Sequence, residues 1–373
     1  MPSVVGVPKE IKDQEGRVSM QPDGVVELVH HGHEVIVQAG AGFGAGFSDE
    51  EYEKAGGRVV ESAVEVFASS DLIVKVKEPT PQEYDHFREG QELFTYLHLA
   101  ADKELTEFLM ERRINSVAYE TVELPDGSLP LLAPMSEVAG RMSVQAAAHC
   151  LESPQGGAGL LLGGVPGTPA AKVTIIGGGV VGTEAAKIAV GMRAMVNVLD
   201  VNPKRLAYLS DIFGGRIDLV IPNRARTAAY VAESDVVIGA VLVAGAKAPK
   251  LVSREMVASM REGSVVVDVA IDQGGCVETA RPTTHSEPTY VEEGVIHYCV
   301  ANIPGAVART STLALTSVTL PYLVKIADGG VEGAAAADPT LAKGLSTLDG
   351  NLVSEPVAEA HDLSYTDPQK LLR

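Results

Sequence analysis

The sequence predicts an α/β protein with two domains, each a doubly wound parallel sheet. Three observations support this fold class. The chain has 373 residues, which is long for a single domain. Short β-branched runs alternate with helical segments along most of its length. Residues 172–200 run as a strand, a glycine-rich turn, a helix and a second strand, which is the order of a nucleotide-binding βαβ unit.

The first third of the chain alternates expected strands with expected helices. The strands are residues 4–7, 33–38, 71–77, 93–97 and 116–119. The helices are residues 24–31, 48–55, 81–87 and 102–113, and Asp102 is the expected N-cap of the last. Helical crossovers between short strands predict a parallel sheet.

The middle of the chain repeats this pattern. Its expected strands are residues 173–176, 195–199, 219–221, 235–240, 264–270 and 295–300. Two expected helices flank them, residues 136–151 with Ser136 as N-cap and residues 308–323, which Pro321 should break. The tail from residue 330 should return to the first domain as helix and loop, which makes that domain discontinuous.

The glycines after the first strand of the middle region fit G-x-G-x-x-G at residues 177–182. Gly177 permits a tight turn, Gly179 lets the backbone approach a pyrophosphate, and Gly182 lets helix and strand pack closely. Asp200 ends the next strand, where a carboxylate binds the adenosine ribose and disfavours a 2′-phosphate. The alternative is a glycine-rich turn in an ordinary βαβ unit.

These features predict a Rossmann-like NAD-binding domain at residues 136–304. Residues 1–135 plus 305–373 should form a second domain of the same class, for the substrate. An active-site cleft is expected to separate the two.

Composition limits the possible partners and the compartment. The net charge of −19 argues against nucleic acid and against an anionic membrane surface. The N-terminal residues lack the apolar core of a signal peptide, and no run is long enough to span a membrane. Cys150, Cys276 and Cys299 fit a reducing compartment and are expected to be small buried hydrophobes. We therefore expect a soluble cytoplasmic protein that acts on a small molecule.

Polar residues follow several expected strands, and ligands bind at the carboxyl ends of such strands. Arg17 and Lys77 suit a small carboxylate, although either one could be a solvated charge at the sheet rim. Period-two alternation does not separate Lys77 from Lys75.

An imidazole and a carboxylate also follow strands. His98 lies between apolar neighbours, as a buried structural histidine would, but its chemistry suits acid–base catalysis. Asp272 follows an apolar strand and could instead form an Asx turn, while Asp268 inside that strand is expected to be structural. His30, His31 and His33 are expected at an exposed helix end without a metal.

Nine segments together resemble the alanine dehydrogenase family, which includes the NAD-binding subunit of nicotinamide nucleotide transhydrogenase. They are GVPKE (6–10), RV (17–18), VKVKEP (74–79), TYLHLA (95–100), AYET (118–121), LLAPMSEVAG (131–140), GAVLVAGAKAPKL (239–251), VDVAIDQGG (267–275) and RPTT (281–284). The resemblance runs nearly end to end.

The resemblance implies pyruvate bound by Arg17 and by Lys77 rather than Lys75, with His98 and Asp272 as acid/base residues. It implies NAD contacts at Ser136, Gly177, Gly178, Gly179, Val181, Gly182, Asp200, Arg205, Val241, Leu242, Val269, Ala270, Ile271, Val300 and Asn302. It also implies a homo-oligomer, commonly a hexamer. Lys325 and Gly329 stand where some relatives bind magnesium, so no metal site is expected. Pro222 and Arg193 depart from the serine and glycine that the family often has there.

The predicted activity is reversible NAD-dependent oxidative deamination of L-alanine to pyruvate and ammonium. Three alternatives remain open. They are the NAD(H)-binding component of a proton-translocating transhydrogenase, a reductase that condenses a keto acid with a larger amine, and a module that senses NADH.

Overall fold

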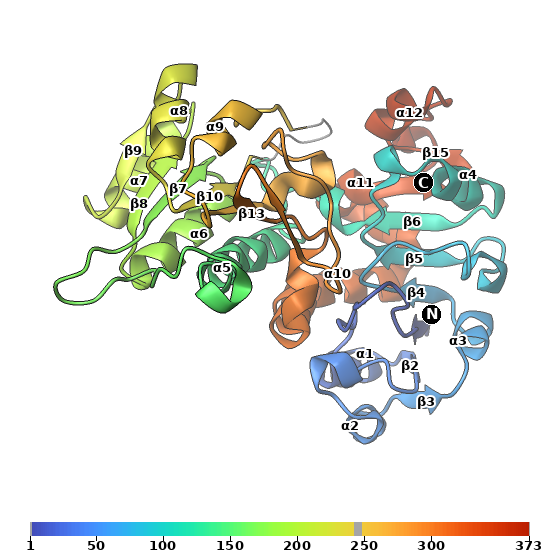
Figure 1. The fold of residues 1–373 in the computed structure, drawn as a ribbon. Coiled ribbons are helices and arrows are strands. Elements are labelled where there is room, and N and C mark those ends of the chain that lie inside the picture. The colour runs from blue at the N-terminus through green and yellow to red at the C-terminus, as the bar shows by residue number, and fades with distance from the viewer. Residues whose placement is uncertain (1, 242–247, 373) are drawn as a thin grey trace. The chain divides into compact units, whose positions relative to one another are not determined.

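The computed structural model describes residues 2–241 and 248–372, which divide into two compact units. Unit 1 contains the chain up to Met135 and again from Val307 onward, and unit 2 is Ser136–Ala306. Each unit is built on its own sheet (Figure 1).

Unit 1 contains an eight-stranded sheet in the described residues, in the order β15-β14-β6-β5-β4-β1-β2-β3. The strands are β1 Val4–Val7, β2 Glu34–Gln38, β3 Arg58–Val60, β4 Leu72–Val74, β5 Glu92–Thr95, β6 Asn115–Ala118, β14 Leu345–Leu348 and β15 Asn351–Leu352. The helices are α1 Pro22–His30, α2 Asp49–Lys54, α3 Ala63–Ser69, α4 Lys103–Glu111, α10 Ala308–Ala337, α11 Pro339–Gly344 and α12 Glu355–His361. Neighbours from β3 to β6 run parallel, whereas β14 is antiparallel to β6 and to β15.

Unit 2 contains a seven-stranded sheet in the described residues, in the order β12-β13-β11-β10-β7-β8-β9. The strands are β7 Lys172–Ile176, β8 Met195–Leu199, β9 Asp218–Val220, β10 Val236–Gly239, β11 Val265–Asp268, β12 Thr289–Glu292 and β13 Val295–Tyr298. The helices are α6 Val180–Gly191, α7 Pro203–Phe213, α8 Arg224–Ala232 and α9 Arg254–Ala258, and α5 Ala133–Cys150 leads in from unit 1. Only β12 is antiparallel to its neighbour among these strands.

Both sheets are wound in two directions from a central strand. In unit 1 the chain leaves β1 toward β2 and β3, and then fills the other side with β4, β5 and β6. In unit 2 it leaves β7 toward β8 and β9, and then adds β10, β11 and β13. The predicted fold class, two doubly wound parallel sheets, is therefore confirmed. Ligands of such sheets bind beyond the carboxyl ends of the strands, next to the point where the winding reverses.

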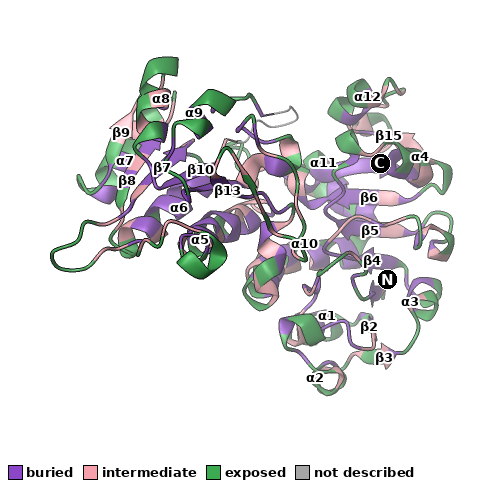
Figure 2. Cartoon of the chain, in the orientation of Figure 1, coloured by how far each residue is buried: buried purple, intermediate pink, exposed green. Residues whose placement is uncertain are grey.

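The core strands are apolar on both sides because helices cover both faces of a parallel sheet. Figure 2 shows the central strands of each sheet as mostly buried and the outer faces of the helices as exposed. In unit 1, Phe67 of α3 and Leu105 of α4 belong to the same buried cluster as Leu93 of β5. All three cysteines are buried, as expected, and each has a free thiol. No helix in the described residues is long and apolar enough to cross a membrane.

Several element predictions need correction. α5 begins at Ala133, so Ser136 lies inside the helix and is not its N-cap, because Pro134 suits a first helical turn. Residues 81–87 form only the short 3-10 helix Tyr84–His86. The tail contributes β14 and β15 in addition to helices. The side chain of His33 is buried against Asp328, at 3.1 Å, and is not exposed.

The break expected at Pro321 lies elsewhere. α10 continues through Pro321 and leaves helical geometry at Gly330, where φ is 71° and ψ is 167°. Glycine tolerates this conformation, which strains other residues. The carboxylate of Glu92 in β5 accepts the N–H of Val331 at 2.7 Å, so a backbone group beside the break keeps a partner.

Glu92 predicts a pH-dependent stability. Burial raises its pKa from 4.5 to about 7, against the opposing effect of the Val331 hydrogen bond and with a smaller contribution from Asp71. The folded state holds the proton of Glu92 more tightly than the unfolded chain does. The contribution of protonated Glu92 to the free energy of unfolding is therefore full below pH 4.5 and is lost as the pH rises through 7. Glu92→Gln stays neutral and keeps an oxygen for Val331.

The variant should therefore exceed the parent in free energy of unfolding by about 1–3 kcal/mol at pH 8, with a smaller gain at pH 5. Urea titrations at the two pH values measure this difference. Asp85→Asn, whose parent side chain is 97% exposed, is the matched control and should show no such gain. Equal gains for Glu92→Gln at both pH values would contradict the linkage.

Candidate active site and nucleotide site

Three sequence-predicted site residues lie beyond the carboxyl ends of three neighbouring strands in the unit 1 sheet. Arg17 follows β1, Lys77 follows β4 and His98 follows β5, and these strands are neighbours. The His98 ring stacks on Tyr96, with centroids 5.9 Å apart and planes 6° from parallel. Tyr96 also interacts electrostatically with Arg17. The winding of the sheet thus brings together residues that are far apart in the sequence.

Arg17 is held rigidly by a neighbouring carboxylate. The guanidinium is 2% exposed, and its Nε and Nη2 donate to the two oxygens of Glu15 at 2.7 and 2.5 Å. Nη1 contacts Sδ of Met135 at 3.3 Å. Burial opposes the charged form, but Glu15 outweighs it and raises the pKa of Arg17. The group is therefore a fixed cation with its plane set by a bidentate pair.

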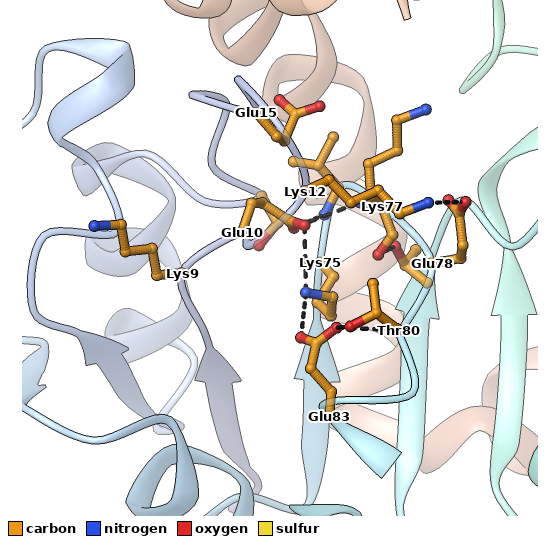
Figure 3. A network of polar contacts seen from close by, with 12 residues as sticks. Lys9, Glu10, Lys12, Glu15, Lys75, Lys77, Glu78, Thr80 and Glu83 are labelled. Carbon is orange, nitrogen blue, oxygen red and sulfur yellow. Dashed lines mark hydrogen bonds and ion pairs between the residues drawn. The ribbon is translucent and has the colours of Figure 1, made fainter. Parts of the chain in front are cut away.

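The two lysines of the VKVKEP segment have different environments (Figure 3). Lys75 is 1% exposed, and its Nζ lies 2.7 Å from Glu83 and 3.3 Å from Glu10. Glu10 also accepts the N–H groups of Val76 at 2.6 Å and Lys77 at 3.4 Å. Lys75 is thus an internal ion of the fold. Lys77 is only half-buried, and its backbone is held by the same carboxylate.

His98 is exposed. Its apolar neighbours in the sequence were also compatible with a buried structural histidine, and that alternative is wrong. Its side chain is 48% exposed, and its backbone is left-handed, with φ at 50°. Glu120 accepts the N–H groups of Leu97 at 3.2 Å and His98 at 2.6 Å. Its Oε1 lies 3.9 Å from Nδ1 of His98. One carboxylate therefore fixes the strained turn and faces the imidazole.

Sequence reasoning missed three carboxylates near these strand ends: Glu15, Glu78 and Glu120. Each stands within two residues of a strand end or of a chosen cation, so position alone could have drawn attention to them. Glu78 pairs with Lys12 (Figure 3). Burial raises the pKa of Glu78, but the charges of Lys77, Lys12 and His98 outweigh this effect and leave the pKa below its ordinary value. Glu78 is therefore ionised at neutral pH.

The glycine turn of unit 2 has the geometry that a dinucleotide requires. Gly177 has φ at 102°. A Cβ at Gly182 would lie 1.9 Å from the carbonyl oxygen of Gly177, so only glycine allows this close packing. A Cβ at Gly179 would meet nothing within 4 Å, so its backbone is open to an approaching group. The turn leads into the N-terminus of α6, whose N–H groups favour phosphate. The residues present fit NAD.

Asp200 and Arg205 both hold the glycine turn. Asp200 follows β8, and its two oxygens accept the N–H groups of Gly178 and Asn202, each at 2.7 Å. Arg205 in α7 donates from Nε to the Gly178 carbonyl at 2.5 Å and from Nη2 to Oγ1 of Thr183 at 2.6 Å. The carboxylate and the guanidinium are therefore built into the turn.

The other predicted nucleotide contacts mostly follow neighbouring strands of the same sheet. Val241 follows β10 and is half-buried, whereas Leu242 lies outside the described residues. After β13, Val300 is buried, and Asn302 has φ at 76°. Ser136 lies half-buried in α5, and Val181 is buried in α6.

Asp272 belongs to the 3-10 helix Val269–Gln273 after β11, together with Ala270 and Ile271. The Asp272 side chain is exposed. The preceding Asp268 is buried and accepts the N–H groups of Ala270 at 3.1 Å and Val277 at 2.9 Å. It therefore has a structural role, in support of the turn that carries Asp272.

The residues expected to depart from the family pattern, or their neighbours, take part in local structure. Asn223, beside Pro222, caps α8 by accepting the N–H of Arg226 at 2.8 Å. Arg193 has φ at 66°, which is the conformation of a glycine that ends a helix. Lys325 pairs with Asp338 at 2.8 Å. Among the described residues, no group of three or more His, Cys, Asp or Glu could hold a metal ion.

Two family models together span most of the chain. Residues 6–139 match the N-terminal domain of alanine dehydrogenase/PNT, and residues 143–355 match its C-terminal domain. The chain belongs to the alanine dehydrogenase/PNT family. Within it, the chain is 57% identical over 370 residues to the alanine dehydrogenase of Methanococcus maripaludis and 55% identical over 368 residues to that of Halomonas elongata. Each alignment covers 99% of both chains.

Solved structures also resemble this chain over most of its length. A structure titled L-alanine dehydrogenase has a TM-score of 0.93 at 55% identity, covering 96% of this chain and 99% of the other. A transhydrogenase from Sinorhizobium meliloti has a TM-score of 0.82 at 27% identity, covering 94% of this chain and 100% of the other. The alanine dehydrogenase/PNT fold is common to both, and identity is higher with the former.

Proposed function

We propose that the protein catalyses the reversible, NAD-dependent oxidative deamination of L-alanine. L-alanine, NAD⁺ and water give pyruvate, NADH, ammonium and a proton. The observation that carries the proposal is the identity of 55–57% with alanine dehydrogenases over nearly the whole chain. The transhydrogenase match is much weaker, at 27%.

Substrate binding is assigned to Arg17 and Lys77. Arg17 offers a guanidinium fixed in plane, and Lys77 a second, more exposed cation near the same strand ends. Between the two lysines of this strand end we propose Lys77, because Lys75 is buried between Glu10 and Glu83 whereas Lys77 is only half-buried. Holding the carboxylate at two points orients the Cα–H bond, and orientation alone can lower a barrier by about 7–11 kcal/mol in favourable systems.

Proton transfer is assigned to His98 of unit 1 and Asp272 of unit 2. Deamination requires a base for the attacking water and an acid for the departing amine. An imidazole that faces Glu120, which also holds the His98 backbone, and an exposed carboxylate on a short helical turn have the required chemistry. We propose that these two residues share the proton transfers.

Residues 136–304 are proposed as the NAD-binding domain, and residues 1–135 plus 305–373 as the substrate domain. The open backbone at Gly179 and the N-terminus of α6 suit the pyrophosphate, and Asp200 suits the ribose hydroxyls. NAD, when bound, supplies the hydride acceptor. We also propose that the protein is cytoplasmic and forms a homo-oligomer, a hexamer as is common in this family. Light scattering of the purified protein can test the number of subunits.

The decisive experiment is NADH oxidation by the purified protein with pyruvate and ammonium. Omitting either one should abolish turnover, and glyoxylate in place of pyruvate measures substrate breadth. NADH binding without turnover would overturn the proposal and would favour the transhydrogenase component or a larger amine.

A further inference from the structure

One oxygen of the Glu78 carboxylate has an unusual environment. Glu78 follows Lys77 at the end of β4, and its Oε1 pairs with Lys12. Its Oε2 is buried and has no hydrogen-bond partner among the residues that the structure describes. A buried oxygen without a donor is costly, and such groups in folded proteins usually receive a ligand or an ordered water.

The charge of this carboxylate makes the missing donor more significant. The pKa of Glu78 lies below its ordinary value, since Lys77, Lys12 and His98 together outweigh the effect of burial. The carboxylate is thus anionic, and an anionic oxygen forms stronger hydrogen bonds than a neutral one. Two of the three groups that act on it, Lys77 and His98, are the proposed substrate-binding and acid/base residues.

The components of the proposed reaction differ in what they can offer to Oε2. The carboxylate and keto group of pyruvate have only acceptors, and the carboxylate is repelled by an anion. Ammonium and the amino group of alanine carry N–H donors and a positive charge. Arg17 and Lys77 are proposed to attract the carboxylate end of the substrate, so an anionic acceptor near Lys77 and His98 suits the nitrogen end.

We propose that Glu78 is the amine-recognition residue of this enzyme, with its Oε2 accepting an N–H of ammonium or of the alanine amino group. This inference rests on the proposed deamination. It makes Glu78 a specificity determinant that favours ammonium or an amine, which carry N–H donors, over an anion at the same position.

The test compares Michaelis constants in the reductive direction at one fixed pH. Glu78→Gln keeps the size of the side chain and removes its charge. The KM for ammonium should rise about 10- to 100-fold, as expected for the loss of a charged hydrogen bond. The KM for pyruvate should stay the same or fall, because Lys77 no longer has an anion beside it. The Kd for NADH, measured by fluorescence, should not change.

Two control variants separate recognition from a merely structural role. Lys12→Met removes the ion pair but leaves the carboxylate, so the KM for ammonium should not rise. Glu89→Gln makes the same chemical change at a side chain that is 72% exposed and should behave as the parent. Parallel increases in both KM values for Glu78→Gln, or a rise in the ammonium KM for Lys12→Met, would overturn the inference. If Oε2 binds only an ordered water, Glu78→Gln should leave the KM for ammonium unchanged, which also overturns the inference. A parent without turnover on pyruvate and ammonium would instead reject the proposed function.

Discussion

Replacing His98 by alanine should lower kcat by about 10²- to 10⁴-fold, the usual contribution of a general acid or base. The Kd for NADH should be unchanged, because the glycine turn, Asp200 and Arg205 belong to unit 2, whereas His98 belongs to unit 1. The melting temperature should also hold, since the side chain is 48% exposed. Stopped-flow turnover, fluorescence titration of NADH and thermal unfolding measure the three quantities.

His149→Ala is the matched control for this experiment. Its parent side chain is 62% exposed and, among the described ion pairs, pairs only with Glu152, three residues further along the chain. The control should retain full activity. If His98→Ala weakened NADH binding as much as it slowed turnover, the acid/base assignment would be wrong.

Replacing Lys75 by methionine should lower the free energy of unfolding by about 3–5 kcal/mol, the usual cost of breaking a buried ion pair from one side. The change leaves Glu10 and Glu83 buried without their shared cation. Burial and the charges of Glu15 and Glu83 raise the pKa of Glu10, whereas Lys75 lowers it, so losing Lys75 makes an ionised Glu10 less favourable. Urea denaturation monitored by circular dichroism measures the loss.

Lys77→Met provides the contrast, two residues along the same strand end. It should change the free energy of unfolding by less than about 1 kcal/mol, as expected at a half-buried site, and should raise the KM for pyruvate strongly. Equal destabilisation by the two substitutions would show that the environments of the two lysines do not determine their roles.

Most of the fold could be predicted because its signals are local. The turn at Gly177, the close packing at Gly182 and the cap at Asp102 each follow from one residue type at one position, and the structure contains all three. β3 was missed because three residues, Arg58–Val60, show no periodicity. The break in α10 was placed at Pro321 because sequence alone could not show that Glu92 supports a break at Gly330.

The candidate site was predicted only in part, for a physical reason. Strand ends pointed to Arg17, Lys77, His98 and Asp272, whose roles stay predictions. The partners that shape these residues come from distant segments. Glu10 contacts the backbone of Val76 from 66 positions away, and Glu120 contacts His98 from 22 positions away. Alternation along a strand cannot reveal which lysine such a carboxylate will engage.

The pairing of β14 with β6 has a consequence for biosynthesis. Thr347 of β14 contacts Ser116 of β6 across 231 positions, and all of unit 2 is translated between them. At about 5–20 residues per second, a ribosome needs roughly 10–50 s to deliver the missing strand. During that time the nascent chain presents β6 as an open sheet edge, which is the kind of surface that invites pairing with other chains. Holding this edge apart from other chains until the last strands emerge is a task suited to a chaperone.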